Sequence, residues 1–210
     1  MSNERGKFIV IEGLDGSGKT TQINKLEKHL KSKGLKVLVT KEPQNDRPIG
    51  QLLRRVLTQD EKTDLRVAAS LFAADRLDHL TRKEGIIDAL ETGAYVLCDR
   101  YYLSNYAYNM VDVDLDWIMS LNREAVKIGK PDLHVYVDVP ADIALSRVNN
   151  RGEAELFENL ERLQRVHDNY DILIDRLSDS EKIFRVDGTR DSHIVFAKIR
   201  DFVDTEIIAN

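Results

Sequence analysis

The residues best suited to chemistry form a glycine-rich segment near the start of the chain, Gly13-Leu-Asp-Gly-Ser-Gly-Lys-Thr20. Its spacing matches the phosphate-binding loop G-x-x-x-x-G-K-[ST]. Glycines let the backbone curl so that successive N–H groups point at phosphate oxygens, and a following helix adds its positive N-terminal end. Lys19 would supply a cation for the β- and γ-phosphates, and Thr20 a hydroxyl for Mg²⁺. The alternative is a glycine-rich turn with a solvated lysine.

This loop therefore predicts a nucleoside-triphosphate site. The residues expected around the triphosphate are Gly13, Leu14, Asp15, Gly16, Ser17, Gly18, Lys19, Thr20 and Thr21.

A second candidate group follows another apolar run, Val96-Leu-Cys-Asp-Arg100. A carboxylate at the carboxyl end of a buried strand beside a phosphate loop orders Mg²⁺, directly or through water, and Asp99 has that place. In an extended chain Arg100 would point to the opposite side, toward a second anion. For Cys98 we expect a small buried side chain rather than a reactive thiol.

Strands and helices must position these residues. Short β-branched runs predict buried strands at Phe8–Ile11, Lys36–Thr40, Tyr95–Cys98 and His134–Val139, with a weaker fifth at Lys182–Val186. Helices are expected from about Lys19, over Asp64–Leu80, over Asp142–Val148 and around Val195–Val203. This alternation predicts an α/β fold with three layers, in which a five-stranded parallel sheet is flanked by helices. Ligands of such sheets bind beyond the carboxyl ends of the strands.

The composition of the chain excludes several classes of protein and of binding partner. The 210 residues are 42% hydrophobic and 32% charged, which excludes a disordered chain, and no linker divides them, so one domain over 1–210 is expected. A net charge of −5 makes a nucleic-acid polymer an unexpected partner. The single cysteine, a polar start and an apolar run too short to span a membrane lead us to expect a cytoplasmic protein with no membrane partner.

Several longer motifs resemble the thymidylate kinases, a family of P-loop nucleoside monophosphate kinases. The resemblance covers nearly the whole chain and rests on Glu12–Gln22, Leu71-Phe-Ala-Ala-Asp-Arg76, Asp99-Arg-Tyr-Tyr-Leu-Ser-Asn-Tyr-Ala-Tyr108, Lys130–Leu133 and Arg151-Gly-Glu153. It implies a P-loop NTPase fold and transfer of the γ-phosphoryl of ATP to thymidine 5′-monophosphate (dTMP), which gives dTDP and ADP for dTTP synthesis. It also implies Mg²⁺ as cofactor and a homodimer.

The resemblance assigns roles at the acceptor base. Phe72 is similar to the ring that stacks on thymine, Arg76 to the residue that hydrogen-bonds the base edge, and Asn105 to the one that bonds the neighbouring ring nitrogen. For Phe72, ordinary core packing is the alternative.

Further roles concern the acceptor's phosphate and sugar. Arg100, with Ser104 close by, is similar to the arginine that holds the 5′-phosphate. Tyr108 resembles the ring that crowds the sugar 2′ position, and Asp15 the carboxylate that reaches the 3′-hydroxyl. The alternatives are core packing for Tyr108 and an N-cap-like turn for Asp15.

A lid is expected at about residues 147–158. Some thymidylate kinases carry a catalytic arginine in the phosphate loop, where this chain has Gly16. We therefore assign that role to Arg151 and place Arg147 beside adenine, with an exposed charged loop as the alternative. The expected catalytic residues are Lys19, Arg151, Asp15 and Arg100.

The loop after the second strand departs from the family. Its sequence, Lys41-Glu-Pro-Gln-Asn-Asp-Arg-Pro48, lacks the Gly-Gly pair usual in bacterial relatives. Lys41, Arg47 or Arg54 could supply the second cation for the acceptor phosphate, and the sequence leaves the choice open. Arg54 is included among the expected dTMP-binding residues.

Two rival functions remain. One is a kinase for another pyrimidine nucleotide or for a deoxynucleoside. The other is a regulatory switch that uses the loop to change shape. The arginines outside the loop disfavour a switch, because a switch needs no second anion site.

Overall fold

The computed structural model describes residues 5–149 and 159–209, and its centre is a five-stranded, wholly parallel sheet in the order β2-β3-β1-β4-β5. The strands are β1 Phe8–Glu12, β2 Val37–Lys41, β3 Tyr95–Asp99, β4 Leu133–Asp138 and β5 Ile183–Asp187. All five predicted strands are confirmed, but the expectation that each is buried is wrong for β2 and β5, which form the two edges of the sheet and are only partly buried. The runs are apolar because β1, β3 and β4 are buried on both faces of the sheet.

Helices alternate with the strands. Their bounds are α1 Lys19–Ser32, α2 Pro48–Leu57, α3 Leu65–Thr81, α4 Ile86–Glu91, α5 Tyr102–Asn109, α6 Leu115–Ile128, α7 Ala141–Asn149, α8 Leu160–Leu177 and α9 Ser192–Val203, followed by a π-helical turn, Asp204–Ile208. Asp64 caps α3, because its carboxylate accepts a hydrogen bond from the Arg66 amide.

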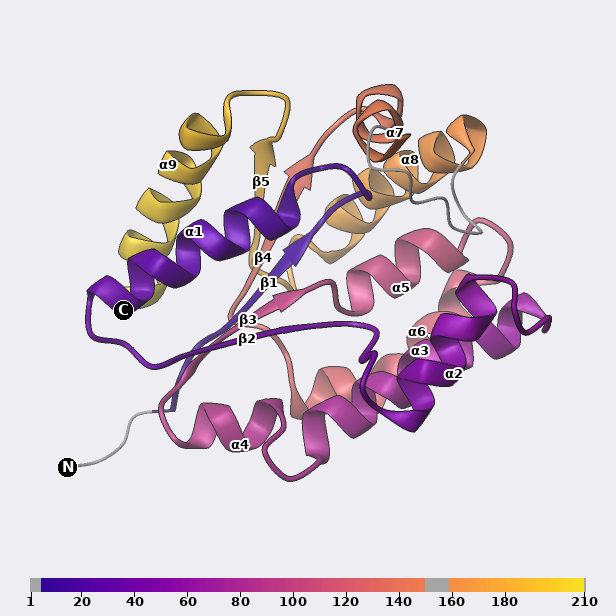
Figure 1. The fold of residues 1–210 in the computed structure, drawn as a ribbon, viewed down its shortest axis with the longest axis horizontal. Coiled ribbons are helices and arrows are strands. Elements are labelled where there is room, and N and C mark those ends of the chain that lie inside the picture. The colour runs from indigo at the N-terminus through magenta and orange to yellow at the C-terminus, as the bar shows by residue number, and fades with distance from the viewer. Residues whose placement is uncertain (1–4, 150–158, 210) are drawn as a thin grey trace.

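Helices cover both faces of the sheet. Figure 1 shows α1 and α9 together on one face, and α4, α5 and α8 on the other. α3 packs between α2 and α6 beyond the carboxyl end of β3. The expected three-layer α/β fold is therefore confirmed.

The strand register brings the functional segments together. Ile11 of β1 pairs with Asp99 of β3, and Asp99 pairs on its other side with Lys41 of β2. The three segments that follow these strands must therefore begin side by side at one edge of the sheet. The single-domain assignment over 1–210 stays a prediction, and most of the expected lid, residues 150–158, lies outside the described residues.

Candidate active site

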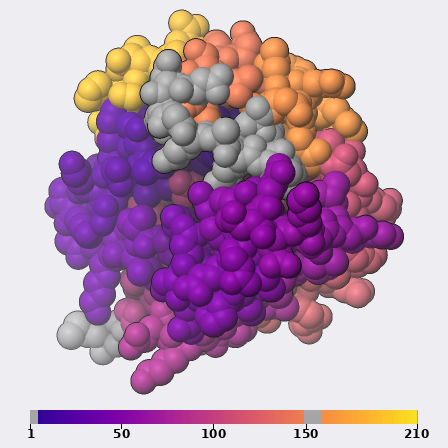
Figure 2. Space-filling view, turned by 45° about the vertical axis from the view of Figure 1, so that its right-hand side comes forward, coloured from indigo at the N-terminus to yellow at the C-terminus, as the bar shows by residue number. Residues whose placement is uncertain are grey.

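A cavity of about 250 Å³ opens at the carboxyl ends of β1, β2 and β3. In Figure 2 it corresponds to the recess between the indigo N-terminal segment and the purple surface of α2 and α3. All the residues expected to bind the acceptor line it: Asp15, Arg54, Phe72, Arg76, Arg100, Ser104, Asn105 and Tyr108. From the phosphate loop, Gly16, Gly18, Lys19, Thr20 and Thr21 line it as well. One cavity thus collects residues that are up to 93 positions apart in the chain.

The phosphate loop connects β1 to α1 in the predicted manner. Gly18 caps α1 with a φ of +97°, a conformation that favours glycine, so Asp15 is not the N-cap. Gly16 has a φ of +82°, and a Cβ built there would lie 2.2 Å from the backbone oxygen of Ala144 in α7. The helix that follows β4 therefore packs directly on the loop, and no side chain fits at position 16 in this arrangement.

Lys19 lies inside the loop. Its Nζ donates hydrogen bonds to the backbone oxygens of Gly13 and Leu14, at 3.1 and 3.0 Å. Burial, together with the nearby charge of Arg100, lowers the pKa of Lys19. The ammonium group is thus held by two backbone carbonyls of the phosphate loop and lies 3.8 Å from the carboxylate of Asp15.

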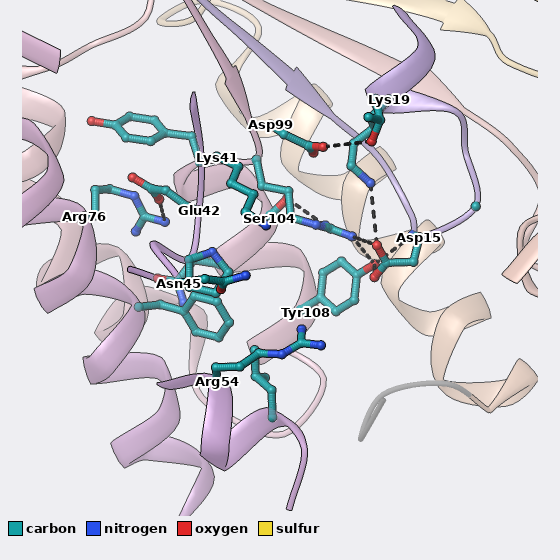
Figure 3. Close-up of a pocket in the computed structure, with 18 of the residues that line it drawn as sticks. Asp15, Lys19, Lys41, Glu42, Asn45, Arg54, Arg76, Asp99, Ser104 and Tyr108 are labelled. Carbon is teal, nitrogen blue, oxygen red and sulfur yellow. Dashed lines mark hydrogen bonds and ion pairs between the residues drawn. The ribbon is translucent and has the colours of Figure 1, made fainter. Parts of the chain in front are cut away.

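Asp15 and Arg100 both line the cavity and form an ion pair there. Arg100 Nη2 lies 2.8 Å from Asp15 Oδ1, and Lys19 Nζ lies 3.8 Å from the same oxygen (Figure 3). The Tyr108 hydroxyl contacts both Asp15 and Arg100, whose guanidinium stacks 4.8 Å from the centre of the tyrosine ring. Partial burial would raise the pKa of the Asp15 carboxyl, but the charges of Arg100 and Lys19 hold it well below its usual range.

The backbone at Arg100 differs from the expected extended chain. Its φ is +70°, in the left-handed region, and its amide donates to the oxygen of Ile11 in β1. The expectation of extended backbone is therefore wrong, because the chain turns sharply where β3 ends. The side chain contacts Asp15 and Ser104, whereas Asp99 contacts Thr20.

Thr20 and Asp99, the two residues expected to hold a metal, lie next to each other. The Thr20 hydroxyl lies 3.4 Å from Asp99 Oδ2, and among the described residues Asp99 Oδ1 has no hydrogen-bond partner although it is buried. A hydroxyl and a carboxylate are hard oxygen donors, and Mg²⁺ is usually held by one or two such groups together with phosphates and water. The residues therefore fit Mg²⁺.

At the other end of the cavity stands the half-buried Phe72, with Arg76 behind it. Arg76 is 1% exposed, and its Nη2 lies 2.7 Å from Glu42 Oε2 (Figure 3). Its Nη1 donates to Asn122 of α6, and Asn122 in turn donates to Asn105. Glu42 and Asn122, which the sequence reasoning missed, thus hold the base-end residues in place.

Glu12 is a further residue that the sequence analysis missed. It is fully buried at the end of β1, accepts a hydrogen bond from the Tyr101 amide at 3.1 Å and accepts another from the Ser104 hydroxyl. Ser104 Oγ also accepts from Arg100 Nη1 at 3.0 Å. Burial raises the pKa of Glu12 to about 7, although Ser104 and Arg100 oppose the shift. A carboxylate at the end of a buried strand, like Asp99, was the signal that could have found it.

The three cations that could support the acceptor phosphate, Lys41, Arg47 and Arg54, lie in two different places. Lys41 and Arg54 line the cavity, where both are exposed. Arg47 precedes α2, and its Nε lies 3.7 Å from the carboxylate of Asp78. The structure therefore brings Lys41 and Arg54 to the cavity and Arg47 to an ion pair elsewhere.

Of the two lid arginines, only Arg147 is described. Its guanidinium donates to the backbone oxygens of Gly16 in the phosphate loop and Gly188 after β5, each at 3.3 Å. Arg147, which was expected beside adenine, thus joins the phosphate loop to the loop that follows β5. Arg151 lies outside the described residues.

Taken together, the cavity is lined by the glycine-rich loop after β1, by the aromatic ring of Phe72 and by the polar side chains of Arg76 and Asn105. Arg100 stands between them, within reach of both Asp15 and Ser104. Two anions bound there would face each other across Arg100 and Lys19.

Among the described residues, no helix combines the length and apolar character that a bilayer-spanning segment requires.

Comparisons with known proteins agree with this geometry. A sequence model of the thymidylate kinase family matches residues 11–199. The chain is 38% identical over 196 residues to a probable thymidylate kinase of Pyrococcus horikoshii, covering 90% of this chain and 93% of the relative. It is 38% identical over 211 residues to a thymidylate kinase of Caldicellulosiruptor saccharolyticus, covering 95% and 97%.

Proposed function

This chain belongs to the thymidylate kinase family, and we propose on that basis that it transfers the γ-phosphoryl group of ATP to dTMP, forming dTDP and ADP for dTTP synthesis. The observation that carries the proposal is the meeting of the phosphate loop, Arg100 and Phe72 around one cavity. A site for a triphosphate alone would need neither a stacking ring nor a second set of cations.

The transfer joins two anions and needs no strong base. An oxygen of the dTMP phosphate attacks Pγ, the bond from Pγ to the β–γ bridging oxygen breaks, and ADP leaves with the electron pair. Catalysis then consists of positioning and charge neutralisation. Lys19 would contact the β- and γ-phosphates, while Arg100, fixed by Ser104, would hold the acceptor phosphate in line.

Mg²⁺ is the proposed cofactor. When bound by Thr20 and Asp99, it would neutralise charge on the β- and γ-phosphate oxygens. The proposal is supported by the 3.4 Å distance between these two residues and by the orphaned Oδ1 of Asp99 among the described residues.

Asp15 is proposed to change its partner when the acceptor binds. In the structure it pairs with Arg100, but its proposed role is to accept a hydrogen bond from the 3′-hydroxyl of dTMP. Acceptor binding would then release Arg100 to the 5′-phosphate, and Tyr108, which contacts both residues, would close on the sugar at its 2′ position. Lys41 and Arg54 are proposed as the further cations around the acceptor phosphate, because both line the cavity.

Arg151 is proposed to be the arginine that neutralises the negative charge which develops on the phosphoryl group in the transition state. No side chain fits at Gly16, so the loop itself cannot supply that group in this arrangement. Arg147, already in contact with Gly16 and Gly188, would flank the adenine. Arg151→Ala should lower turnover by orders of magnitude while the affinity for dTMP stays close to that of the wild type. An unchanged turnover would contradict the assignment.

The test of the function is ADP formation from ATP and Mg²⁺ with a panel of acceptors. We expect dTMP to stimulate it strongly, and thymidine and ribonucleoside monophosphates to stimulate it weakly. A preference for thymidine would indicate a deoxynucleoside kinase, and a preference for another monophosphate would indicate a different pyrimidine nucleotide kinase. ATP turnover that is independent of any acceptor would indicate a regulatory switch.

We also propose a homodimer and a cytoplasmic location. The dimer, which the family resemblance implies, is supported by apolar side chains left exposed on two helices that pack together: Val67 of α3 is 46% exposed and Trp117 of α6 is 37% exposed. The location is supported by Cys98, a free and buried thiol. A single species of 24.0 kDa in sedimentation equilibrium at micromolar concentration would contradict the dimer.

A further inference from the structure

The carboxylate of Glu12, at the end of β1, is fully buried among the residues that hold Arg100. Its Oε1 accepts a hydrogen bond from the amide of Tyr101 at 3.1 Å, and its Oε2 accepts one from the hydroxyl of Ser104. Tyr101 is the N-cap of α5, and its own side chain makes no capping hydrogen bond. Glu12 thus joins β1 to the start of α5, where the helix dipole favours a negative charge. Since Glu12 does not line the cavity, it can act on a bound ligand only through other side chains.

The hydrogen bonds that connect Glu12 to Arg100 run in one direction while Glu12 is ionised. A guanidinium can only donate, so the Ser104 hydroxyl oxygen accepts from Arg100 Nη1, at 3.0 Å. A carboxylate can only accept, so Ser104 gives its single hydroxyl hydrogen to Glu12 Oε2. The Tyr170 hydroxyl, 2.9 Å from Ser104 Oγ and 3.4 Å from Glu12 Oε2, must then be a donor as well. Glu12 therefore polarises the hydroxyl of Ser104, which presents its oxygen to Arg100.

The two terminal nitrogens of Arg100 have different partners. Nη1 bonds the buried Ser104, whereas Nη2 lies 2.8 Å from the Asp15 carboxylate and 3.1 Å from the Tyr108 hydroxyl. Asp15 and Tyr108 are the residues proposed to turn to the sugar of the acceptor. Nη2 would then be released for the acceptor phosphate, while Nη1 stays bound to Ser104 and Glu12.

The electrostatics of Glu12 agree with this link. Burial raises the pKa of Glu12, and the largest influences that oppose the rise are the hydroxyl of Ser104 and the charge of Arg100. His134 also lies close, with its Nδ1 4.0 Å from Glu12 Oε1, but burial lowers the pKa of His134 to about 3. His134 is therefore neutral near pH 7, and the positive charge that faces Glu12 comes from the side of Arg100.

We propose that Glu12 is a positioning residue that acts through Ser104 to fix the Nη1 side of Arg100, so that Nη2 faces the acceptor phosphate. The inference rests on the proposed function, because it takes the acceptor to be a nucleoside monophosphate held by Arg100. In Glu12→Gln the amide oxygen can still accept from the Tyr101 amide, but the NH₂ group then faces Ser104. This NH₂ group donates to the oxygen that Arg100 needs, and the negative charge is lost. Arg100 stays charged but loses its fixed direction.

The first measurement compares two ligands that differ only in the phosphate, dTMP and thymidine. Their dissociation constants are measured by calorimetry with the wild type and Glu12→Gln at about pH 8.5, above the pKa of about 7 of Glu12. We expect the Kd of dTMP to rise at least about tenfold in the variant and that of thymidine to stay within about twofold. A general loosening of the cavity would weaken both ligands alike. Equal changes for the two ligands, or no change for either, would overturn the inference.

The second measurement asks whether the effect passes through Arg100. Glu12→Gln is combined with Arg100→Met, and kcat/KM for dTMP is determined for both single variants and for the double variant. We expect Glu12→Gln to lower kcat/KM at least about tenfold when Arg100 is present, and less than about threefold when it is replaced. Losses that multiply in the double variant would show that Glu12 acts independently of Arg100, against the inference. If dTMP does not stimulate ADP formation with the wild type, the proposed function fails before any variant is compared.

A matched control is Glu181→Gln, the same chemical change at a second buried carboxylate. Glu181 is 9% exposed, and its Oε2 lies 3.8 Å from Nε2 of His134, whereas Glu12 faces Nδ1 of the same ring. We expect the control to keep the wild-type ratio of the two dissociation constants, and a change as large as that in Glu12→Gln would overturn the inference. Melting temperatures identify which variants fold. If Glu12→Gln does not, Ser104→Ala takes its place in both measurements, with the same outcomes expected, because it removes the same link to Arg100.

Discussion

The carboxylate of Asp15 and the guanidinium of Arg100 form an ion pair, with 2.8 Å between Oδ1 and Nη2, although they belong to the loops that follow two different strands. The pairing of Ile11 with Asp99 explains it, because the register brings the ends of β1 and β3 to the same height. The turn at Arg100, with a φ of +70°, then directs its side chain back over the phosphate loop. Arg100, the proposed ligand of the acceptor phosphate, is therefore oriented by a residue of the phosphate loop.

Arg100→Met should lower kcat/KM for dTMP by about 100- to 1000-fold, because the variant loses the cation that holds the acceptor phosphate. The same change frees Asp15 of its closest positive partner, so the pKa of Asp15 should rise. Initial rates of ADP release measure the first effect. Arg66→Met serves as control, since Arg66 pairs with Asp64 on the surface and is 70% exposed. Equal losses in the two variants would argue against a special role for Arg100.

Asp99→Asn should raise the Mg²⁺ concentration needed for half-maximal rate by at least about tenfold, because an amide replaces the carboxylate that contacts Thr20. The measurement is a Mg²⁺ titration of the rate at saturating ATP and dTMP. Asp187→Asn is a matched control at the end of β5, where Asp187 bonds Thr189 and Arg190. A normal Mg²⁺ dependence in Asp99→Asn would remove this residue from the metal site.

Gly16→Ala should abolish most activity and lower the free energy of unfolding by roughly 1–3 kcal/mol. A Cβ at this position would lie 2.2 Å from the Ala144 oxygen, so either the phosphate loop or α7 must move. Gly34→Ala offers a close control, because Gly34 has a similar φ of +80° but nothing within 4 Å of the added atom. We expect Gly34→Ala to lose some stability and keep its activity. Identical activity in both variants would show that the contact with Ala144 is not needed.

Lys41→Met should raise KM for dTMP by about tenfold with a smaller change in kcat, because Lys41 lines the acceptor end of the cavity. Arg47→Met should leave KM within about twofold, since Arg47 faces Asp78. Steady-state kinetics at saturating ATP distinguish the two. A larger effect from Arg47 would mean that this loop rearranges when dTMP binds.

The sequence predicted the centre of the sheet well because β1, β3 and β4 are buried on both faces, which leaves continuous apolar runs. Its strand ends were less accurate: Glu12, Lys41 and Asp99 extend the predicted strands, since a polar residue at a carboxyl end still pairs with its neighbours. The residues expected to bind dTMP all line one cavity, because each of them except Arg54, which lies on α2, stands in a motif that follows a strand or lies on α3.

Other features had no signal in the sequence. The left-handed turn at Arg100 is unexpected because few residues other than glycine adopt it. Asn122 lies in the middle of α6, where nothing in the helical pattern indicates that a buried amide contacts Arg76 and Asn105. The choice between Lys41 and Arg47 likewise depends on where α2 begins and how it packs on α3, which spacing does not determine.

Glu12 should make the stability of the protein depend on pH near neutrality. Burial raises its pKa from 4.5 to about 7, so between these values the folded protein binds a proton that the unfolded chain releases. This contribution to stability is therefore complete below about pH 4.5 and is lost as the pH rises to about 7, a difference of roughly 3 kcal/mol. Glu12→Gln cannot titrate, so the wild type should lose its stability relative to this variant across the same range.

The measurement is chemical denaturation of wild type and Glu12→Gln at several pH values between 4.5 and 8, followed as the difference in free energy of unfolding. Taking the difference matters, because His134, whose Nδ1 lies 4.0 Å from Glu12, has its pKa lowered by burial to about 3 and contributes with the opposite sign up to pH 6.5. Both proteins carry His134, so its contribution largely cancels. Glu124→Gln, at a carboxylate that is 64% exposed, should show a flat difference. A flat difference for Glu12→Gln as well would mean that Glu12 is ionised throughout, with Arg100 and Ser104 outweighing its burial.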